Sequence, residues 1–168
     1  LKLQFEVLKT ENKGIPVIVV AGGSSTRMGQ NKQLINVCGL PVLVRTLKVF
    51  QQCDGVSNII LVASSETLLE YQNLCEKYML SKVSDVVEGG KNRQESVLCG
   101  MRCLKESDEL VLIHDGARPL VTDDVINRVI NGLKTHLAVT PVVKVKDTIK
   151  KIAENGEVIK TVCRDDLV

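Results

Sequence analysis

The fold is decided by residues 15–33, IPVIVVAGGSSTRMGQNKQ, where an apolar run leads directly into a loop of small and basic residues. Valine and isoleucine dominate residues 15–20, which favours a buried strand, and similar runs recur downstream. We predict strands at 15–20, 58–63, 83–87, 110–114 and 137–143. Runs that are nearly continuous in Val, Ile and Leu are typical of parallel strands covered on both faces. The sequence therefore predicts an α/β fold on an open, doubly wound, mostly parallel sheet.

Amphipathic stretches separate these strands, and we predict helices at 41–52, 66–77, 92–105 and 123–135. Pro41 suits a first helical position, while Ser65 and Thr122 are residue types that cap helix N-termini. In such sheets ligands bind beyond the carboxyl ends of the strands. The loops at 21–33, 88–93 and 114–120 should therefore share one edge and one crevice.

The last part of the chain follows a different pattern. An Asn-Gly step at residues 155–156 separates two β-rich runs at 145–152 and 157–162, and this step favours a tight hairpin. We predict a protruding β-arm at 144–168, after a core at 15–143. Residues 1–14 are left unassigned as an N-terminal extension.

Composition narrows the classes of function. The 168 residues carry 22 Lys and Arg against 20 Asp and Glu, with both signs scattered, and aromatic residues make up 2%. Neither an extended basic surface nor a stacking surface for nucleic acid is expected. An anionic ligand must therefore be bound by a few charged residues within one site. The apolar runs fall short of the roughly 20 residues of a membrane span, and the N-terminus lacks a signal-peptide pattern. We expect a cytoplasmic protein without nucleic-acid or membrane partners, whose six cysteines are reduced thiols.

The loop after the first strand predicts a phosphate cradle. Small residues let consecutive backbone N–H groups turn toward an anion, and hydroxyl side chains add donors. Two cations, Arg27 and Lys32, bracket the loop, as expected where negative charge builds up during phosphoryl or nucleotidyl transfer. The loop has neither the Walker pattern nor the G-x-G-x-x-G spacing. The residues predicted to cradle the nucleotide are Ala21, Gly22, Gly23, Ser24, Ser25 and Thr26.

The end of the fourth predicted strand carries a second set of candidate ligands. Asp115 is a candidate ligand of Mg²⁺, and the guanidinium of Arg118 can fork onto a phosphate. His114 is the last residue of the strand, and we expect a packed, hydrogen-bonded imidazole without a catalytic role.

The loop after the third predicted strand carries a third set. Its paired glycines at 89–90 permit close backbone approach. Arg93 and Ser96 lie at a helix start, where a base or a ribose could be hydrogen-bonded.

These three elements, in this order, resemble the 2-C-methyl-D-erythritol 4-phosphate cytidylyltransferase family of the non-mevalonate isoprenoid pathway. The family's Ala-Gly, Arg-Met-Gly and Lys-Gln pattern matches residues 21–22, 27–29 and 32–33. Its Gly-Gly, Arg, Ser-Val and Gly pattern matches 89–90, 93, 96–97 and 100, and its His-Asp and Ala-Arg-Pro signature matches 114–115 and 117–119. The resemblance runs from about residue 15 to the C-terminus. It implies a Rossmann-like nucleotidyltransferase sheet, with 15–143 as the nucleotide-binding core.

The resemblance also implies a reaction and its residues. The implied enzyme transfers CMP from CTP to methylerythritol phosphate and releases pyrophosphate, with Mg²⁺ as cofactor and a homodimer as the assembly. The arm is implied to dimerise and to reach the acceptor bound to the other subunit. The implied catalytic residues are Arg27, Lys32, Asp115 and Arg164. Asp115 is also implied to bind the metal. The CTP-binding residues are those of the cradle with Gly90, Arg93, Ser96 and Gly116, and the acceptor-phosphate residues are Asp115, Arg118, Thr148 and Arg164.

The chain departs from the family pattern at several positions. Asn31 stands where many members have Pro, Lys91 where the loop is often acidic, and Cys163 where Asp is common before Arg164. The family also continues into a closing strand and helix, with a Lys that contacts the acceptor, which the residues up to Val168 do not match. Two alternatives stay open: a cytidylyltransferase for ribitol phosphate or another polyol phosphate, and a nucleotide-binding module without activity.

Overall fold

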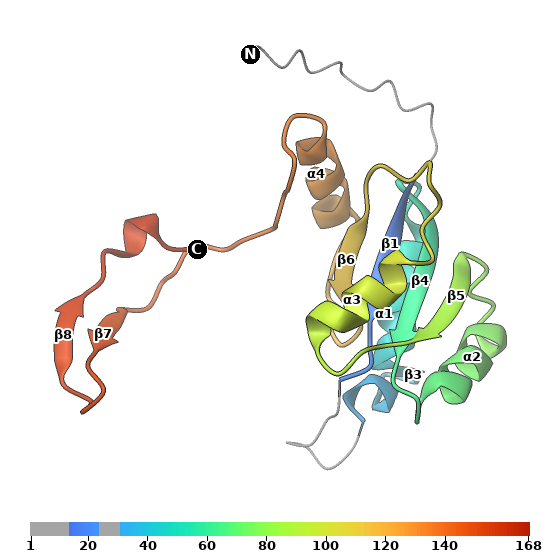
Figure 1. The fold of residues 1–168 in the computed structure, drawn as a ribbon, viewed down its shortest axis with the longest axis horizontal. Coiled ribbons are helices and arrows are strands. Elements are labelled where there is room, and N and C mark those ends of the chain that lie inside the picture. Colours follow the sequence, from blue (N-terminus) through green and yellow to red (C-terminus); the bar gives the residue numbers. More distant parts are fainter. Residues whose placement is uncertain (1–13, 24–30) are drawn as a thin grey trace. The chain divides into compact units, whose positions relative to one another are not determined.

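The structure, a computed structural model, describes residues 14–23 and 31–168. Its central feature is a four-stranded sheet (Figure 1). The strands are β1 (Ile15–Val20), β4 (Val56–Ala63), β5 (Val83–Glu88) and β6 (Leu112–Asp115), in the order β5-β4-β1-β6. Every neighbouring pair runs parallel. The predicted α/β fold on a parallel sheet is confirmed.

Helices cover both faces of this sheet. They are α1 (Val42–Gln52), α2 (Leu68–Lys77), α3 (Arg93–Met101) and α4 (Asp123–Leu133). In Figure 1, α3 lies in front of β1 and β4, while α1 lies behind them. The helix α3 approaches closely because Gly100 has no side chain: a Cβ there would lie 2.6 Å from Ile18 Cγ2. The central strands are consequently buried from both sides, with Val17, Ile18 and Val19 fully inaccessible, which is why their sequence lacks polar alternation.

Short elements lie between β1 and α1. They are the 3-10 helix η1 (Lys32–Leu34) and a small hairpin of β2 (Asn36–Val37) and β3 (Leu40–Pro41). The hairpin turn has positive φ at Cys38 and at Gly39, 47° and 82° respectively. Pro41 therefore ends β3 and precedes the first residue of α1 rather than being that residue.

The helix ends correct some of the sequence predictions. Thr122 does accept a hydrogen bond from Val125 N, at 3.4 Å, as a cap of α4. Ser65 is not the N-cap of α2. Residues 64–67 form a turn, closed by a hydrogen bond from Thr67 N to Ser64 O at 3.1 Å, and Thr67 takes the N-cap position. The helix at 92–105 is shorter than predicted, and α3 ends at Met101, because the following bonds are of the tighter three-residue type, such as Leu104 N to Met101 O.

The chain divides into two compact units, the first ending at Ile130 and the second covering Asn131–Val168. The second unit contains the antiparallel pair β7 (Lys150–Ile152) and β8 (Val158–Thr161), followed by the 3-10 helix η2 (Arg164–Asp166). Gly156, with φ of 86°, makes the turn of this hairpin. The hairpin predicted from the Asn-Gly step is confirmed. The role of 144–168 as a dimerisation arm stays a prediction.

The strand predicted at 137–143 is wrong. These residues form no strand in the structure, and the side chains of Leu137 and Val143 are 90% and 83% exposed. An apolar run becomes a strand only when a neighbouring strand receives its backbone hydrogen bonds. In the described part of the chain, β6 pairs with β1 and no strand continues the sheet beyond it.

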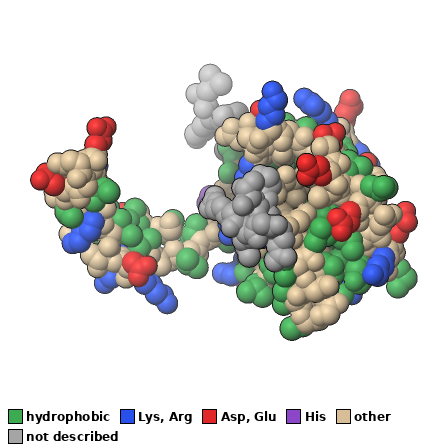
Figure 2. All heavy atoms as spheres, turned by 90° about the horizontal axis from the view of Figure 1, so that it is seen from below, with side chains coloured by type: hydrophobic (Ala, Val, Ile, Leu, Met, Phe, Trp, Pro, Cys, Tyr) green, Lys and Arg blue, Asp and Glu red, His purple; other side chains and the backbone are tan. Residues whose placement is uncertain are grey.

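Surface charge is mixed, as the composition indicated. On the face of the first unit drawn in Figure 2, basic and acidic side chains are interspersed. None of the helices in residues 14–23 and 31–168 is long and apolar enough to cross a membrane.

Candidate functional site at the carboxyl edge of the sheet

The parallel register brings the strand ends together. Val20 of β1 is level with Val62 of β4 and with Asp115 of β6, and Ala63 is level with Glu88 of β5. The segments that follow these strands therefore start at one edge, as predicted for the three loops. The chain passes from β1 through β4 to β5 and then returns to β6 on the other side of β1. The order thus reverses between β1 and β6, which is where ligands bind in open α/β sheets.

The loops after β1 and β6 are in direct contact. Gly116 N donates to Val20 O at 2.8 Å, and a Cβ on Gly116 would lie 2.9 Å from Ala21 Cβ. From α1, the buried Thr46 hydroxyl donates to Gly116 O at 2.9 Å. The turn after β6 is therefore fixed on two sides, and glycine is required there for space.

Three charged side chains meet at this edge. Arg93, at the start of α3, donates from Nε and Nη2 to Asp115 Oδ1 at 3.1 and 3.0 Å. Arg118 donates from Nε to Asp115 Oδ2 at 2.9 Å. The side chain of Asp115 is 32% exposed, and those of Arg93 and Arg118 are 61% and 74% exposed. We call Arg93, Asp115 and Arg118 the edge cluster. In it, two exposed guanidinium groups pair with one carboxylate.

Asp115 is held in its ionised form. Partial burial would raise the pKa of its carboxyl, but the hydrogen bonds from Arg93 and Arg118 and their positive charges outweigh this and lower the pKa. Among the described residues no group of three or more His, Cys, Asp and Glu gathers as a metal cage. A single carboxylate nevertheless fits Mg²⁺, which takes one or two carboxylates and completes its shell with substrate phosphates and water.

We expect the stabilising effect of Asp115 to depend on pH. Because its pKa in the folded chain lies below the ordinary value of about 3.9, the ionised carboxylate stabilises the fold above that pH. This contribution is lost as the pH falls through the lowered pKa. The difference in unfolding free energy between the wild-type chain and Asp115→Asn should therefore shrink as the pH falls from about 5 through the lowered pKa. Urea unfolding at a series of pH values measures it, and a constant difference would contradict the ion-pair assignment.

His114 is the last residue but one of β6, since the strand ends at Asp115, and its side chain contacts α1 and the turn after β6. Its ring packs edge-on against Phe50, with 4.9 Å between ring centroids, and its Nε2 lies 3.1 Å from Arg118 O. Because a carbonyl only accepts, Nε2 carries the proton in this contact. Burial lowers the pKa of His114, against the raising effects of the Arg118 carbonyl and Asp115. The expected packed, hydrogen-bonded imidazole is confirmed.

The start of α3 forms a compact turn. Asn92 is the N-cap, with Oδ1 accepting from Glu95 N at 2.9 Å, and Glu95 Oε2 accepts from Lys91 N at 3.0 Å. Gly90 N donates to Ser96 Oγ at 3.2 Å, so these two predicted base-binding residues are bonded to each other. This capping places Arg93 at the first turn of the helix and within reach of Asp115.

The first loop is described only in part. Of its predicted residues, Ala21, Gly22, Gly23 and Lys32 are described, whereas Ser24, Ser25, Thr26 and Arg27 lie outside the described residues. Ala21 N donates to Val62 O at 2.7 Å, so its amide continues the sheet and is engaged there. Gly22 follows in close contact with β4, since a Cβ on it would lie 3.0 Å from Ala63 O. Lys32 is the exposed first residue of η1.

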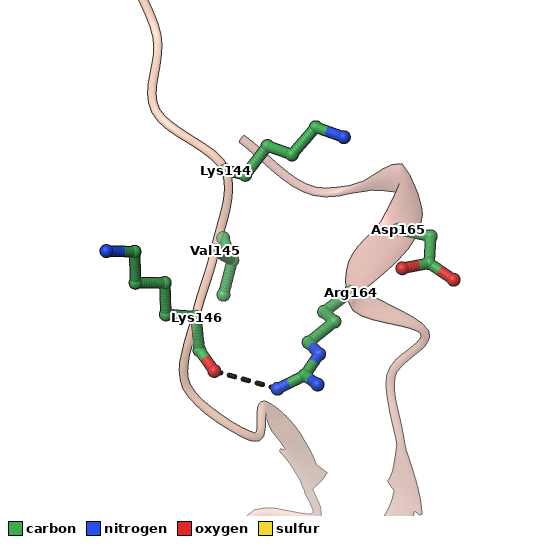
Figure 3. Close-up of a pocket in the computed structure, with 5 residues that line it drawn as sticks. All are labelled: Lys144, Val145, Lys146, Arg164 and Asp165. Carbon is green, nitrogen blue, oxygen red and sulfur yellow. Dashed lines mark hydrogen bonds between the residues drawn. The ribbon is translucent and has the colours of Figure 1, made fainter.

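The second unit holds the other predicted residues. Arg164 Nη1 donates to Lys146 O at 2.8 Å, and it lines a pocket of about 380 Å³ with Lys144, Val145, Lys146 and Asp165 (Figure 3). Thr148 is in the same unit. In this pocket Lys146 presents its backbone carbonyl to Arg164, and its side chain points away from Arg164 (Figure 3).

Sequence reasoning missed three residues that hold the edge in place. They are Gln33 and Tyr71, which both donate to Ala21 O, and Thr46. Gln33 is 5% exposed, and its Oε1 has no hydrogen-bond partner among the described residues. Thr46 and Tyr71 lie within otherwise ordinary amphipathic stretches, whereas Gln33, in the first loop, had a signal as part of the Lys-Gln pattern.

Comparisons with known proteins show the family of the chain. The model of the family described as IspD, 2-C-methyl-D-erythritol 4-phosphate cytidylyltransferase, matches residues 15–168. A curated protein of that name from Clostridium novyi is 49% identical over 153 residues, which cover 89% of this chain and 66% of the relative. Its counterpart from Halalkalibacterium halodurans is 44% identical, with 90% and 66% covered.

A solved structure shares the fold. The 4-diphosphocytidyl-2C-methyl-D-erythritol synthase from Anaerococcus prevotii matches with a TM-score of 0.79 and 33% identity, over 92% of this chain and 66% of that one. The chain thus spans just under two-thirds of the length of these relatives. Because the family model matches nearly all of the chain and the sequence identity to curated relatives is high, the chain belongs to the 2-C-methyl-D-erythritol 4-phosphate cytidylyltransferase family.

Proposed function

We propose that this chain transfers CMP from CTP to 2-C-methyl-D-erythritol 4-phosphate and releases pyrophosphate. The observation that carries the proposal is the edge cluster, in which Arg93 and Arg118 flank Asp115 at the point where the strand order reverses. Two guanidinium groups in that position suit a triphosphate and a phosphate monoester. The named activity of the relatives supplies the identity of both substrates.

The proposed chemistry needs no covalent enzyme intermediate. A phosphate oxygen of the acceptor attacks the α-phosphorus of CTP, the bond to the β-phosphate oxygen breaks, and pyrophosphate leaves with that electron pair. The acceptor's phosphate is already a nucleophile near neutral pH, so the chain has to position the reactants and stabilise charge. Arg27 and Lys32 act on the α-phosphate and the leaving group, and Gly90, Ser96 and Gly116 on cytosine and ribose.

Asp115 is the residue that would hold Mg²⁺. Bound there, the ion would neutralise phosphate charge and help orient the triphosphate. The carboxylate would then exchange part of its pairing with Arg93 and Arg118 for the metal. The released guanidinium groups would become available for phosphate oxygens, which couples nucleotide binding to the opening of the edge cluster.

The acceptor and the assembly involve the second unit. We infer that Thr148 and Arg164 bind the acceptor phosphate, because Arg164 lines a pocket of this unit and a guanidinium group can fork onto a phosphate. The homodimer is supported by exposed apolar side chains on the hairpin, since Ile152, Val158 and Ile159 are all more than half exposed. Sedimentation analysis tests the dimer. A cytoplasmic location stays a prediction from the sequence.

Pyrophosphate release tests the activity. The chain is incubated with each common nucleoside triphosphate, crossed with methylerythritol phosphate, ribitol phosphate and glycerol phosphate. We expect release only with CTP and methylerythritol phosphate. Release with ribitol phosphate or glycerol phosphate instead would favour the other polyol acceptors. Binding of CTP in calorimetry, without release for any acceptor, would identify a nucleotide-binding module.

A further inference from the structure

Side chains tie together the two described ends of the first loop. Asn31 Nδ2 donates to the Tyr71 hydroxyl oxygen at 3.1 Å, and the Tyr71 hydroxyl donates to Ala21 O at 3.4 Å. Gln33 Nε2 donates to the same carbonyl at 3.2 Å. We call Ala21, Asn31, Gln33 and Tyr71 the loop bracket. It connects the end of β1 with η1 through a residue of α2, forty positions from Asn31.

Both ends of the Asn31 amide are used. Its Oδ1 accepts from Gln33 N at 3.0 Å, which makes Asn31 the N-cap of η1. With the oxygen engaged there, the nitrogen faces Tyr71. Lys32 lies between Asn31 and Gln33 in the chain, so its backbone is fixed from both sides by members of the loop bracket. A proline at position 31 would offer neither the cap nor the donor.

Tyr71 is suited to act as a fixed anchor. Its side chain is fully inaccessible to solvent, and a buried tyrosine hydroxyl requires a partner. Burial raises the pKa of Tyr71, so the hydroxyl keeps its proton and remains a donor. Because the ring of Tyr71 is packed in the core, its hydroxyl has a defined position from which it can hold the two loop ends.

We propose that Tyr71 is a positioning residue, which acts through Asn31 to hold Lys32 at the edge of the sheet where the nucleotide binds. The proposal rests on the proposed function and deepens it. The hydroxyl does not touch the reacting atoms, so its effect must pass through Lys32. Loss of the Tyr71 hydroxyl should therefore lower kcat only when Lys32 is present.

The central test is a double-mutant cycle on pyrophosphate release. Tyr71→Phe retains the buried ring and should lower kcat by about 3–10-fold, the equivalent of one neutral hydrogen bond, with the KM for the acceptor unchanged. In a Lys32→Ala background the same change should alter kcat by less than about twofold. Equal losses in both backgrounds would show a merely structural role and overturn the proposal.

Two further variants complete the cycle. Asn31→Ser retains a capping oxygen but cannot reach Tyr71, and it should match the loss of Tyr71→Phe without adding to it in the double variant. Tyr78→Phe is the matched control, because it removes a hydroxyl at the end of the same helix but outside the loop bracket. It should leave kcat unchanged. A loss in Tyr78→Phe equal to that of Tyr71→Phe would refute the assignment.

A second readout does not depend on activity. The amides of Gln33 and Leu34 are bonded to Asn31 Oδ1 and Asn31 O, so their hydrogen exchange should speed up about 3–10-fold in Tyr71→Phe, while the amides of β4 keep their protection. Unchanged exchange at both would overturn the loop bracket. If the wild-type chain released no pyrophosphate, the proposed function would fail. The loop bracket would then be tested by hydrogen exchange alone.

Discussion

Lys32→Ala is expected to lower kcat for pyrophosphate release by about 10²–10³-fold, as when one preorganised donor to developing charge is removed. Negative charge grows on the leaving pyrophosphate as the bond to the α-phosphorus breaks. A positive side chain that is already in place stabilises this charge without reorganisation. Because the effect belongs to the transition state, kcat should fall much more than the affinity for CTP. Steady-state kinetics with calorimetric titration of CTP separates the two.

The matched control is Lys105→Ala. Lys105 is exposed in the turn between α3 and β6, at the amino edge of the sheet, so the same charge is removed away from the strand ends. It should leave kcat within about twofold of the wild-type value. Full turnover in Lys32→Ala would remove the first loop from the proposed chemistry.

Asp115→Asn should have a comparable effect, about 10²–10³-fold on kcat, for two reasons that act together. The amide is a weaker ligand for Mg²⁺, so the half-saturating Mg²⁺ concentration should rise. It also leaves Arg93 and Arg118 without the carboxylate that orients them at 3.0 and 2.9 Å. Rates measured across a Mg²⁺ titration test both parts.

Asp108→Asn serves as the control for this substitution. Asp108 Oδ2 accepts from Lys105 N at 2.8 Å in the turn before β6, and an asparagine oxygen can accept the same bond. Its kcat and Mg²⁺ dependence should equal those of the wild-type chain. An active Asp115→Asn variant with unchanged Mg²⁺ dependence would refute the assignment of Asp115 as the metal ligand.

The parallel sheet shows what local sequence can predict. The apolar runs predicted β1, β4, β5 and β6 to within a few residues, most clearly for β1 and β4, because a strand buried on both faces must be largely apolar. The same rule failed at 137–143, an apolar run that forms no strand in the structure. Burial and pairing are properties of neighbours in space, and composition alone does not report them.

The candidate site shows a similar division. Arg93 and Asp115 were both predicted from their places at strand ends, but their contact depends on the order of strands in the sheet. Tyr71 carried no signal at all, since a tyrosine in an amphipathic helix has the pattern of an ordinary core residue. Its hydroxyl became visible only when α2 was placed against the ends of the first loop.

The sequence by itself determined the alternation of strands and helices, the glycines and charged residues that follow each strand, and the membership of the family. The tertiary structure alone decided that two arginines share one carboxylate and that a buried tyrosine anchors the loop bracket. The physical reason is the separation along the chain over which each interaction acts. Strand propensity, capping and glycine geometry act over a few neighbouring residues, whereas ion pairs and buried hydrogen bonds join positions that only the packed sheet and helices bring within about 3 Å.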